Sequence, residues 1–327
     1  MVNLSRTTLR GLAAVGALAG FAALALPNAQ AAQTSSTATT VKTASAATTA
    51  ATQTAATPKP IPLDGTGMVA GPPPAGDGLT TKSSLTNVVR YNKLYKTGAV
   101  TPSKCKEVNV SLRTYAGVVA YDTQLFKCIY AAWALPLKQA GAAYKVAPKL
   151  VIHNSSAVNS PCGVVTGGTA FFCGVNHGYI YIPAYVIINY WKQSPTMARA
   201  YATFTISHEY GHHVQWLTGI LNASWARQNA FSTYAAQLEE SRRRELQASC
   251  LGGAVDGANK RYYPFSGGLM TQYNWVVSNS GDQPGGVRDH GSLKNHAFWV
   301  TSGFNARHSY TVAGNCNTFN ASSAYVA

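Results

Sequence analysis

Residues 207–215 read SHEYGHHVQ, and this stretch constrains the fold more than any other part of the chain. The helix that would carry it has clear ends, because Ser194 and Pro195 supply an N-cap and a first-turn proline, and Gly219 follows the last periodic residue. We therefore predict that the segment 195–219 forms one helix of about 23 residues.

Two histidines of this helix, His208 and His212, are four residues apart. This separation places both side chains on one face, about one turn apart, where two imidazoles can reach a single ion. Glu209 lies about 100° around the helix, off that face but close enough to take a proton from a water on the ion. The spacing predicts a hydrolytic zinc site.

Such a site needs a third protein ligand and an open position for water. His213 is five residues from His208 and points about 140° away from it, so we expect His213 to pack or hydrogen-bond. A histidine six residues after His212 is excluded, because Thr218 stands there. A carboxylate from a second helix is left, and the segment 232–255 is the only downstream helix with glutamates.

Three glutamates of that helix compete for the third position. Glu239 and Glu240 are each followed at i+4 by an arginine, Arg243 and Arg244, which predicts ion pairs on a solvated face. Glu245 lies where the helix becomes apolar, and a carboxylate there costs several kcal/mol unless it is paired or bound to metal. We therefore expect Glu245 to be the ligand.

The organisation of the chain indicates export. Residues 1–31 have basic residues, a short apolar run and small residues before a cleavage site, which is the layout of a secretory signal peptide. Residues 32–82, rich in Ala, Thr and Ser and then in Pro and Gly, are predicted to be a linker or pro-segment. Residues 83–327 are predicted to form one domain. No later stretch has the roughly 20 apolar residues of a membrane span, so we expect a secreted protein.

The chain is basic, with 26 Lys and Arg against 11 Asp and Glu. This balance favours attraction to polyanions, such as an anionic cell-wall polymer or an acidic substrate. No zinc-finger, phosphate-loop or aromatic nucleic-acid motif occurs, so we expect no nucleic-acid partner.

Six cysteines lie in the predicted domain, and an even count in an exported chain favours disulfides. Cys162 and Cys173 are the best local pair, because the residues between them are typical of a β-hairpin turn. The predicted pairs are Cys162 with Cys173, Cys250 with Cys316, and Cys105 with Cys128.

Other segments indicate helices around a small sheet. Residues 85–98 are predicted to be a short amphipathic helix, and residues 122–141 a core helix that begins near Asp122. Residues 149–154 and 179–183 read as strands. The expected fold class is α+β, mainly helical, stapled by disulfides, with the helix of the two histidines packed against the helix of Glu245.

Several motifs together resemble those of a bacterial family of neutral zinc metallopeptidases. SHEYGHHVQWLTGI, RRELQASCLGG, CGVVTGGTAFFC followed by YIYIP, HGS and the terminal CNTF occur in the family's order, and the family's signatures resemble HExGHHVQ and LELQADC. The resemblance extends from Pro148 to Phe319. It implies a zincin-like fold and the disulfides Cys162–Cys173 and Cys250–Cys316.

The resemblance also implies roles for individual residues. His208, His212 and Glu245 would bind one zinc ion, and Glu209 would activate water. A further donor is needed for the oxyanion of peptide hydrolysis, and His290 of the sequence DHGS and Tyr210 are the candidates.

The chain departs from the family pattern at two places. Ser249 stands where the family has an aspartate, which in related zinc peptidases accepts the N–H of a ligand histidine. Loss of such a partner costs about 10 to 100-fold in metal affinity or activity, so we expect a weakened site unless Asp256 or Asp289 substitutes. Asn295 and His296 replace a Gln-Arg pair of the family.

The sequence therefore predicts a secreted, monomeric, zinc-dependent endopeptidase that acts on proteins or peptides. The alternative is a catalytically impaired zinc-binding protein that attaches to anionic cell-wall or host polymers. Ser249 and the basic charge support that alternative.

Overall fold

The computed structural model describes residues 68–69, 71–74, 84–306 and 315–327. The signal peptide predicted for residues 1–31 and most of the linker predicted for residues 32–82 lie outside the described residues. Within the described part, no helix is both long and apolar enough to cross a membrane.

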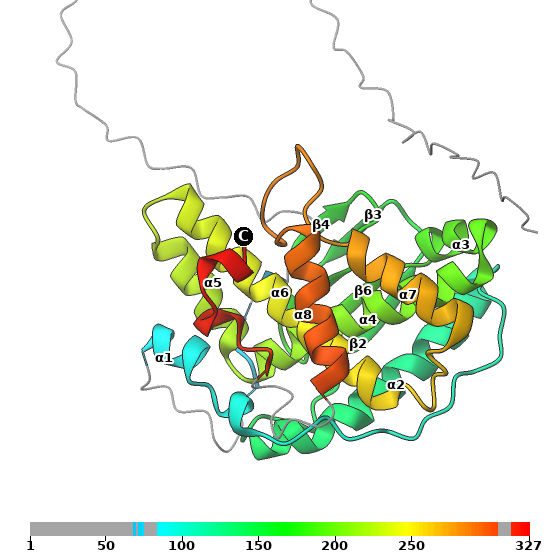
Figure 1. Cartoon of the computed structure of the whole chain (residues 1–327), viewed down its shortest axis with the longest axis horizontal. Coiled ribbons are helices and arrows are strands. Elements are labelled where there is room, and N and C mark those ends of the chain that lie inside the picture. The colour runs from blue at the N-terminus through cyan, green and yellow to red at the C-terminus, as the bar shows by residue number, and fades with distance from the viewer. Residues whose placement is uncertain (1–67, 70, 75–83, 307–314) are drawn as a thin grey trace, which may run out of the picture. The chain divides into compact units, whose positions relative to one another are not determined.

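Eight α-helices and six short strands make up the described part (Figure 1). The helices are α1 (Leu85–Arg90), α2 (Tyr115–Gln139), α3 (Ala184–Gln193), α4 (Pro195–Leu217), α5 (Ile220–Ala230), α6 (Tyr234–Asn259), α7 (Gly267–Asn279) and α8 (Leu293–Asn305). The strands are β1 (Met68–Val69), β2 (Lys149–His153), β3 (Ala157–Ser160), β4 (Gly163–Thr166), β5 (Phe171–Gly174) and β6 (Tyr179–Pro183). The chain therefore has the mainly helical α+β, zincin-like fold that was predicted.

Four of the strands form one mixed sheet in the order β1-β5-β6-β2. β5 is antiparallel to β6, whereas β2 is parallel to β6 and β1 is parallel to β5. The hairpin predicted between Cys162 and Cys173 is wrong, because β4 pairs with the preceding strand β3 and β5 pairs with β6. The turn residues that suggested it separate two different sheets.

Helix α4 follows the predicted limits. Ser194 caps it, since its hydroxyl accepts a hydrogen bond from the backbone N–H of Met197, and Pro195 occupies the first turn. Gly219 has a φ of 77°, a left-handed conformation that glycine adopts without steric cost, and the chain turns there into α5.

Two other helices differ from the prediction. The segment 85–98 is not one helix, because α1 ends at Arg90 and a 3-10 turn over Lys93–Lys96 follows, capped by Asn92. The core helix starts earlier than Asp122, because the hydroxyl of Thr114 caps it by accepting from the N–H of Gly117.

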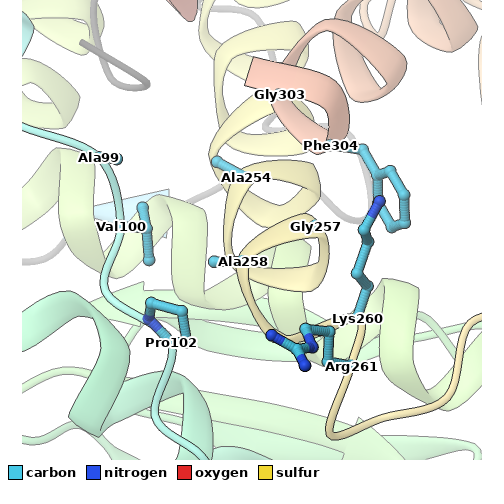
Figure 2. Close-up of a pocket in the computed structure, with 10 residues that line it drawn as sticks. All are labelled: Ala99, Val100, Pro102, Ala254, Gly257, Ala258, Lys260, Arg261, Gly303 and Phe304. Carbon is cyan, nitrogen blue, oxygen red and sulfur yellow. The ribbon is translucent and has the colours of Figure 1, made fainter. Parts of the chain in front are cut away.

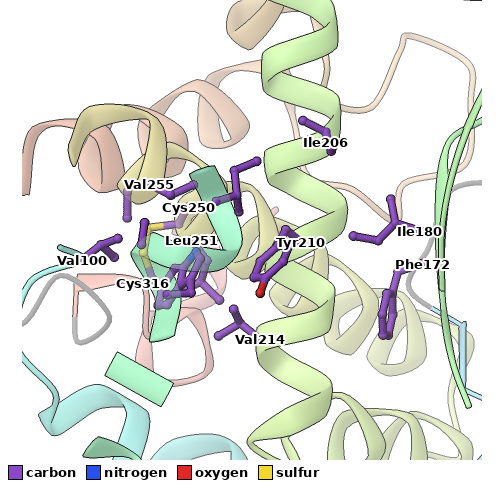
Figure 3. Packing of buried hydrophobic residues seen from close by; sticks show 14 of the residues in the cluster. Val100, Phe172, Ile180, Ile206, Tyr210, Val214, Cys250, Leu251, Val255 and Cys316 are labelled. Atoms are coloured by element: carbon purple, nitrogen blue, oxygen red, sulfur yellow. A yellow bond between two sulfur atoms is a disulfide. The ribbon is translucent and has the colours of Figure 1, made fainter. Parts of the chain in front are cut away.

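Helix α4 lies at the centre of the fold. One side of it contacts the sheet through β5 and β6, and another side packs against α6, which also packs against α8 (Figure 1). Figure 3 shows Ile206, Tyr210 and Val214 of α4 among buried residues of the sheet and of α6. Helix α4 is therefore held on both sides, which fixes the direction of its polar side chains.

Two disulfides are present, Cys162–Cys173 and Cys250–Cys316 (Figure 3 shows the second). The predicted Cys105–Cys128 disulfide is wrong, because both cysteines are unbonded thiols in the structure. Burial, together with the neighbouring Cys105 thiol, raises the pKa of Cys128 to about 12. Oxidation requires a thiolate, and this environment disfavours it.

Candidate metal centre

Helices α4 and α6 bring His208, His212 and Glu245 together. Their ligand atoms all lie within 4.8 Å of one another. Glu245 Oε2 is 3.0 Å from His212 Nε2 and 3.5 Å from His208 Nε2. His208 is 9% exposed, and the other two residues are fully buried. The structure thus places the three predicted ligands at one point.

The two helices can approach closely because glycines face their neighbours. A Cβ atom on Gly211 would lie 2.4 Å from the carbonyl oxygen of Ala248 in α6. A Cβ atom on Gly252 would lie 2.9 Å from the backbone nitrogen of His208 in α4. The backbones of α4 and α6 are therefore in contact at Gly211 and at Gly252, which brings Glu245 within reach of the histidines.

His212 is oriented by Gln215, which lies one turn further along α4. The amide nitrogen of Gln215 donates to the carbonyl oxygen of Arg244 at 2.8 Å and to Oε1 of Gln247 at 3.0 Å. Its Oε1 must therefore accept, and it lies 2.9 Å from His212 Nδ1. Nδ1 of His212 therefore donates to Gln215, and its Nε2 lies on the opposite side of the ring, 3.0 Å from Oε2 of Glu245.

His208 is oriented by Ser249, whose Oγ lies 2.9 Å from His208 Nδ1. Neither aspartate considered as a substitute for an acidic residue at this position contacts His208. Asp256 accepts hydrogen bonds from the hydroxyl groups of Ser207 and Tyr273, while Asp289 forms a hydrogen bond with His290. The serine itself therefore occupies the orienting position.

The surroundings of the site shift the pKa values of two of the three side chains, His208 and Glu245. Burial lowers the pKa of His208 to about 4, so its imidazole is neutral near pH 7. Burial alone would raise the pKa of Glu245, but the charges and hydrogen bonds of His212 and His208 hold it well below its usual range. Two imidazoles and one carboxylate form a donor set that suits zinc.

One prediction for this helix is wrong. Glu240 and Arg244 are both buried, and Glu240 pairs with Arg227 instead of Arg244. The guanidinium of Arg244 lies 4.4 Å from the ring centre of Trp225, and its Nε is 3.6 Å from Oε1 of Glu245. The predicted Glu239–Arg243 pair does form, but Arg243 is buried and not on a solvated face, while the face of Arg244 packs against α5.

Glu209 lies beside the ligands and has one uncommitted oxygen. Its Oε2 is buried and has no hydrogen-bond partner among the described residues. Burial and the charge of Glu245 raise its pKa well above the ordinary value, and the backbone N–H of Phe172 in β5 acts in the opposite direction. The carboxyl group of Glu209 therefore binds a proton more tightly than an exposed glutamate does.

His290 also reaches the centre, with its Nε2 3.8 Å from Oε2 of Glu245. Nδ1 of His290 donates to Asp289 at 2.8 Å, and Oδ1 of Asp282 accepts from the backbone N–H groups of both residues. Burial lowers the pKa of His290, but the hydrogen bond to Asp289 and the charges of Glu245, Asp289 and Asp282 raise it to about 9. The side chain is therefore a cation that can donate.

Two aromatic residues of the motif have packing roles. Tyr210 is fully buried, contacts the rings of Phe126 and His213, and belongs to the main core (Figure 3), so the structure does not place it in the site. His213 is buried as well, and its Nε2 lies 3.1 Å from the carbonyl oxygen of Val146. This agrees with the expectation that it is not a ligand.

The roles of Gln215, Gln247 and Asp282 were not predicted from the sequence, and Asp289 was predicted only as a substitute partner of His208, whereas it bonds to His290. Gln215 could have been found, because a residue three positions after a ligand histidine shares its helix face. The partners on α6 and in the loop after α7 carry no local signal, since their contacts depend on how separate segments pack.

A pocket of about 260 Å³ lies elsewhere, between the C-terminal ends of α6 and α8 (Figure 2). Its wall is largely apolar and small, with Lys260 and Arg261 at one side. None of the residues of the candidate centre lines it.

Comparison with known proteins agrees with the geometry. A family model described as "Putative neutral zinc metallopeptidase" matches residues 84–263, more than half of the chain. This range includes the three candidate ligands and Glu209, whereas His290 lies beyond it. No curated protein and no solved structure matched the chain. The match and the ligand set together show that the chain belongs to this family of neutral zinc metallopeptidases.

Proposed function

We propose that the protein is a zinc-dependent endopeptidase that acts outside the cell on proteins or peptides. His208, His212 and Glu245 would hold one zinc ion. The observation that carries the proposal is the convergence of their three ligand atoms, with both imidazoles turned toward the same point by hydrogen bonds. Two disulfides support the proposed location, since such bonds persist in oxidising compartments.

Zinc, when bound, supplies a Lewis acid that activates water and polarises a peptide carbonyl. Glu209 is the residue we assign to proton transfer. Its buried Oε2 has no other partner among the described residues, so it can take a proton from water and deliver it to the leaving amine. The N–H of Phe172 holds the carboxylate in place and favours its ionised form.

His290 is the residue we assign to oxyanion stabilisation. Because its Nδ1 is committed to Asp289, its Nε2–H can donate to the oxygen that gains charge as the carbonyl carbon becomes tetrahedral. Asp289 thereby orients the ring and holds it in the protonated form, and Asp282 fixes the loop.

The alternative function is a catalytically impaired polyanion-binding protein, motivated by the missing charge of Ser249 and by the basic balance of the chain. The contact from Ser249 to His208 and the convergence of the ligand atoms favour the hydrolase instead. We therefore retain the hydrolase as the one proposed function.

The test is turnover of casein or a quenched peptide by the purified full-length protein with added zinc. Glu209→Gln should lower kcat by about 10² to 10⁴-fold while the zinc content stays the same, because only the base is lost. Glu239→Gln is the matched control, since it makes the same change in the Glu239–Arg243 ion pair away from the ligands, and it should keep full activity. Equal turnover by wild type and Glu209→Gln would refute the proposed function.

Metal analysis tests the third ligand independently. Glu245→Ala should lose zinc during dialysis, because two imidazoles alone bind the ion weakly and the empty side would admit water. If Glu245→Ala retains one zinc per chain, the assignment of Glu245 is incorrect.

A further inference from the structure

Ser249 lies between two imidazoles. Its Oγ is 2.9 Å from Nδ1 of His208 on α4 and 3.0 Å from Nε2 of His296 on α8. On the far side of His296, Nδ1 lies 2.9 Å from the carbonyl oxygen of Val277 on α7. Ser249 and His296 are 1% and 3% exposed, so water does not compete for these contacts. A continuous hydrogen-bond chain therefore joins four helices and ends at the candidate metal centre.

The direction of this chain follows from its last member. A carbonyl oxygen can only accept, so Nδ1 of His296 carries its proton and donates to Val277. Burial lowers the pKa of His296 to about 3, so the ring is neutral and its Nε2 is an acceptor. The hydroxyl proton of Ser249 must then point at His296 Nε2. A lone pair of Ser249 Oγ remains to accept the Nδ1–H of His208.

The same order decides what His208 offers to a metal. With its proton on Nδ1, His208 has a bare lone pair on Nε2, the atom that lies 3.5 Å from Glu245 Oε2. A serine by itself would not guarantee this state. Its hydroxyl can donate as well as accept, and a hydroxyl that donated to Nδ1 would select the opposite tautomer, with Nε2 protonated and unable to bind.

We propose that His296, acting through Ser249, is a positioning residue that fixes His208 in the tautomer able to bind metal. His296 does so by accepting the one proton that Ser249 could otherwise give to His208. The inference rests on the proposed metal site.

A purely structural role for His296 makes a different prediction. The ring also packs against Phe204, with the ring centres 5.5 Å apart, so its loss will disturb packing whatever else it does. Packing alone would lower stability without changing the proton position on His208. The position of that proton is therefore the deciding observable.

The first measurement uses ¹⁵N-labelled full-length protein prepared without zinc. Imidazole ¹⁵N–¹H correlation spectra should show His208 as the Nδ1–H tautomer in wild type. Ser249→Ala and His296→Phe should both move His208 toward the Nε2–H form or a mixture of the two. His296→Gln should restore the wild-type pattern, because the glutamine oxygen can accept from Ser249.

The second measurement is zinc affinity by competition with a chelator. Ser249→Ala and His296→Phe should each lower the affinity by about 10 to 100-fold, the usual effect of losing a partner of a ligand histidine. The double variant should lose no more zinc affinity than the single variant with the larger loss, because the two residues act through one hydrogen-bond chain. Ser207→Ala is the matched control. It removes a buried serine hydroxyl beside His208 that bonds to Asp256 instead, and it should leave zinc affinity unchanged.

Two results would overturn the proposal. The first is a His208 that stays Nδ1–H in His296→Phe, and the second is a His296→Phe variant that binds zinc as tightly as wild type. Failure of the proposed function looks different: wild-type protein would then bind no zinc, or would turn over substrate no faster than Glu209→Gln, while the tautomer shift in the zinc-free variants would still decide the inference. If His296→Phe does not fold, His296→Gln and Ser249→Ala supply the same comparison. A Ser249→Ala spectrum like that of wild type would then refute the proposed role of the hydrogen-bond chain.

Discussion

Replacing Gly211 with alanine should separate the two helices that hold the ligands. The added Cβ would lie 2.4 Å from the carbonyl oxygen of Ala248 and 2.9 Å from its Cα, and both are backbone atoms that cannot rotate away. Ordinary contact begins at 3.4 Å, so α4 and α6 must move apart by about 1 Å at this point. Glu245 is one turn from Ala248 and would move with it.

The size of the effect follows from that displacement. Overpacking a core costs about 1–3 kcal/mol, and a collision between two backbones should lie at or above the upper end. With a urea m value of about 3 kcal/mol per molar for a domain of this size, the unfolding midpoint should fall by about 1 M. A shift of about 1 Å at a catalytic centre costs about 10²-fold in rate, so activity should fall more than stability alone explains.

Urea unfolding and zinc competition on the same protein samples test this reasoning. Gly268→Ala is the matched control, because the nearest atom to its added Cβ is Cγ2 of Thr196 at 3.8 Å. That control should be neutral or stabilising by about 0.5–1 kcal/mol, the usual gain from alanine over glycine in a helix. A Gly211→Ala protein with the wild-type midpoint and wild-type zinc affinity would show that α4 and α6 do not pack this closely.

Two further predictions follow from other parts of the structure. Asp289→Asn should move the basic limb of the pH profile of kcat/KM to lower pH, because His290 donates only while it is protonated and Asp289 raises the pKa of His290. An unchanged basic limb would show that His290 takes no part in catalysis. The Cys250→Ala, Cys316→Ala double variant should lose about 4 kcal/mol of unfolding free energy, since the bond closes a loop of 66 residues. Denaturant titration measures it, and a loss below about 1 kcal/mol would contradict the loop-entropy estimate.

The parts of the site that could be predicted from the sequence are those set by helix geometry. The spacing of His208 and His212 fixes their common face whatever surrounds the helix, and the caps at Ser194 and Gly219 set its limits. Glu245 could be chosen over its neighbours because a lone carboxylate in an apolar stretch needs a partner. Each of these inferences uses contacts within about one helical turn.

The predictions that were wrong concern contacts between segments that are distant in the sequence. The i,i+4 rule pairs Glu240 with Arg244, but α5 supplies Arg227 and Trp225, and those contacts from another helix prevail. The residues between Cys162 and Cys173 do form a turn, but β4 pairs with β3 and β5 pairs with β6. Strand pairing and the partners of buried charges depend on tertiary packing, which local sequence does not encode.

The neutral partner of His208 also affects the base. Glu209 and Glu245 are two buried carboxylates in one centre, and the charge of Glu245 already raises the pKa of Glu209. An acidic residue at position 249 would add a third negative charge across the His208 ring from Glu245 and would raise the pKa of Glu209 further. Ser249 can orient His208 without that charge, but only if its hydroxyl proton is directed elsewhere, and His296 is the acceptor within reach. The serine and the second histidine therefore form one solution to two requirements, a fixed ligand tautomer and a base that can still ionise.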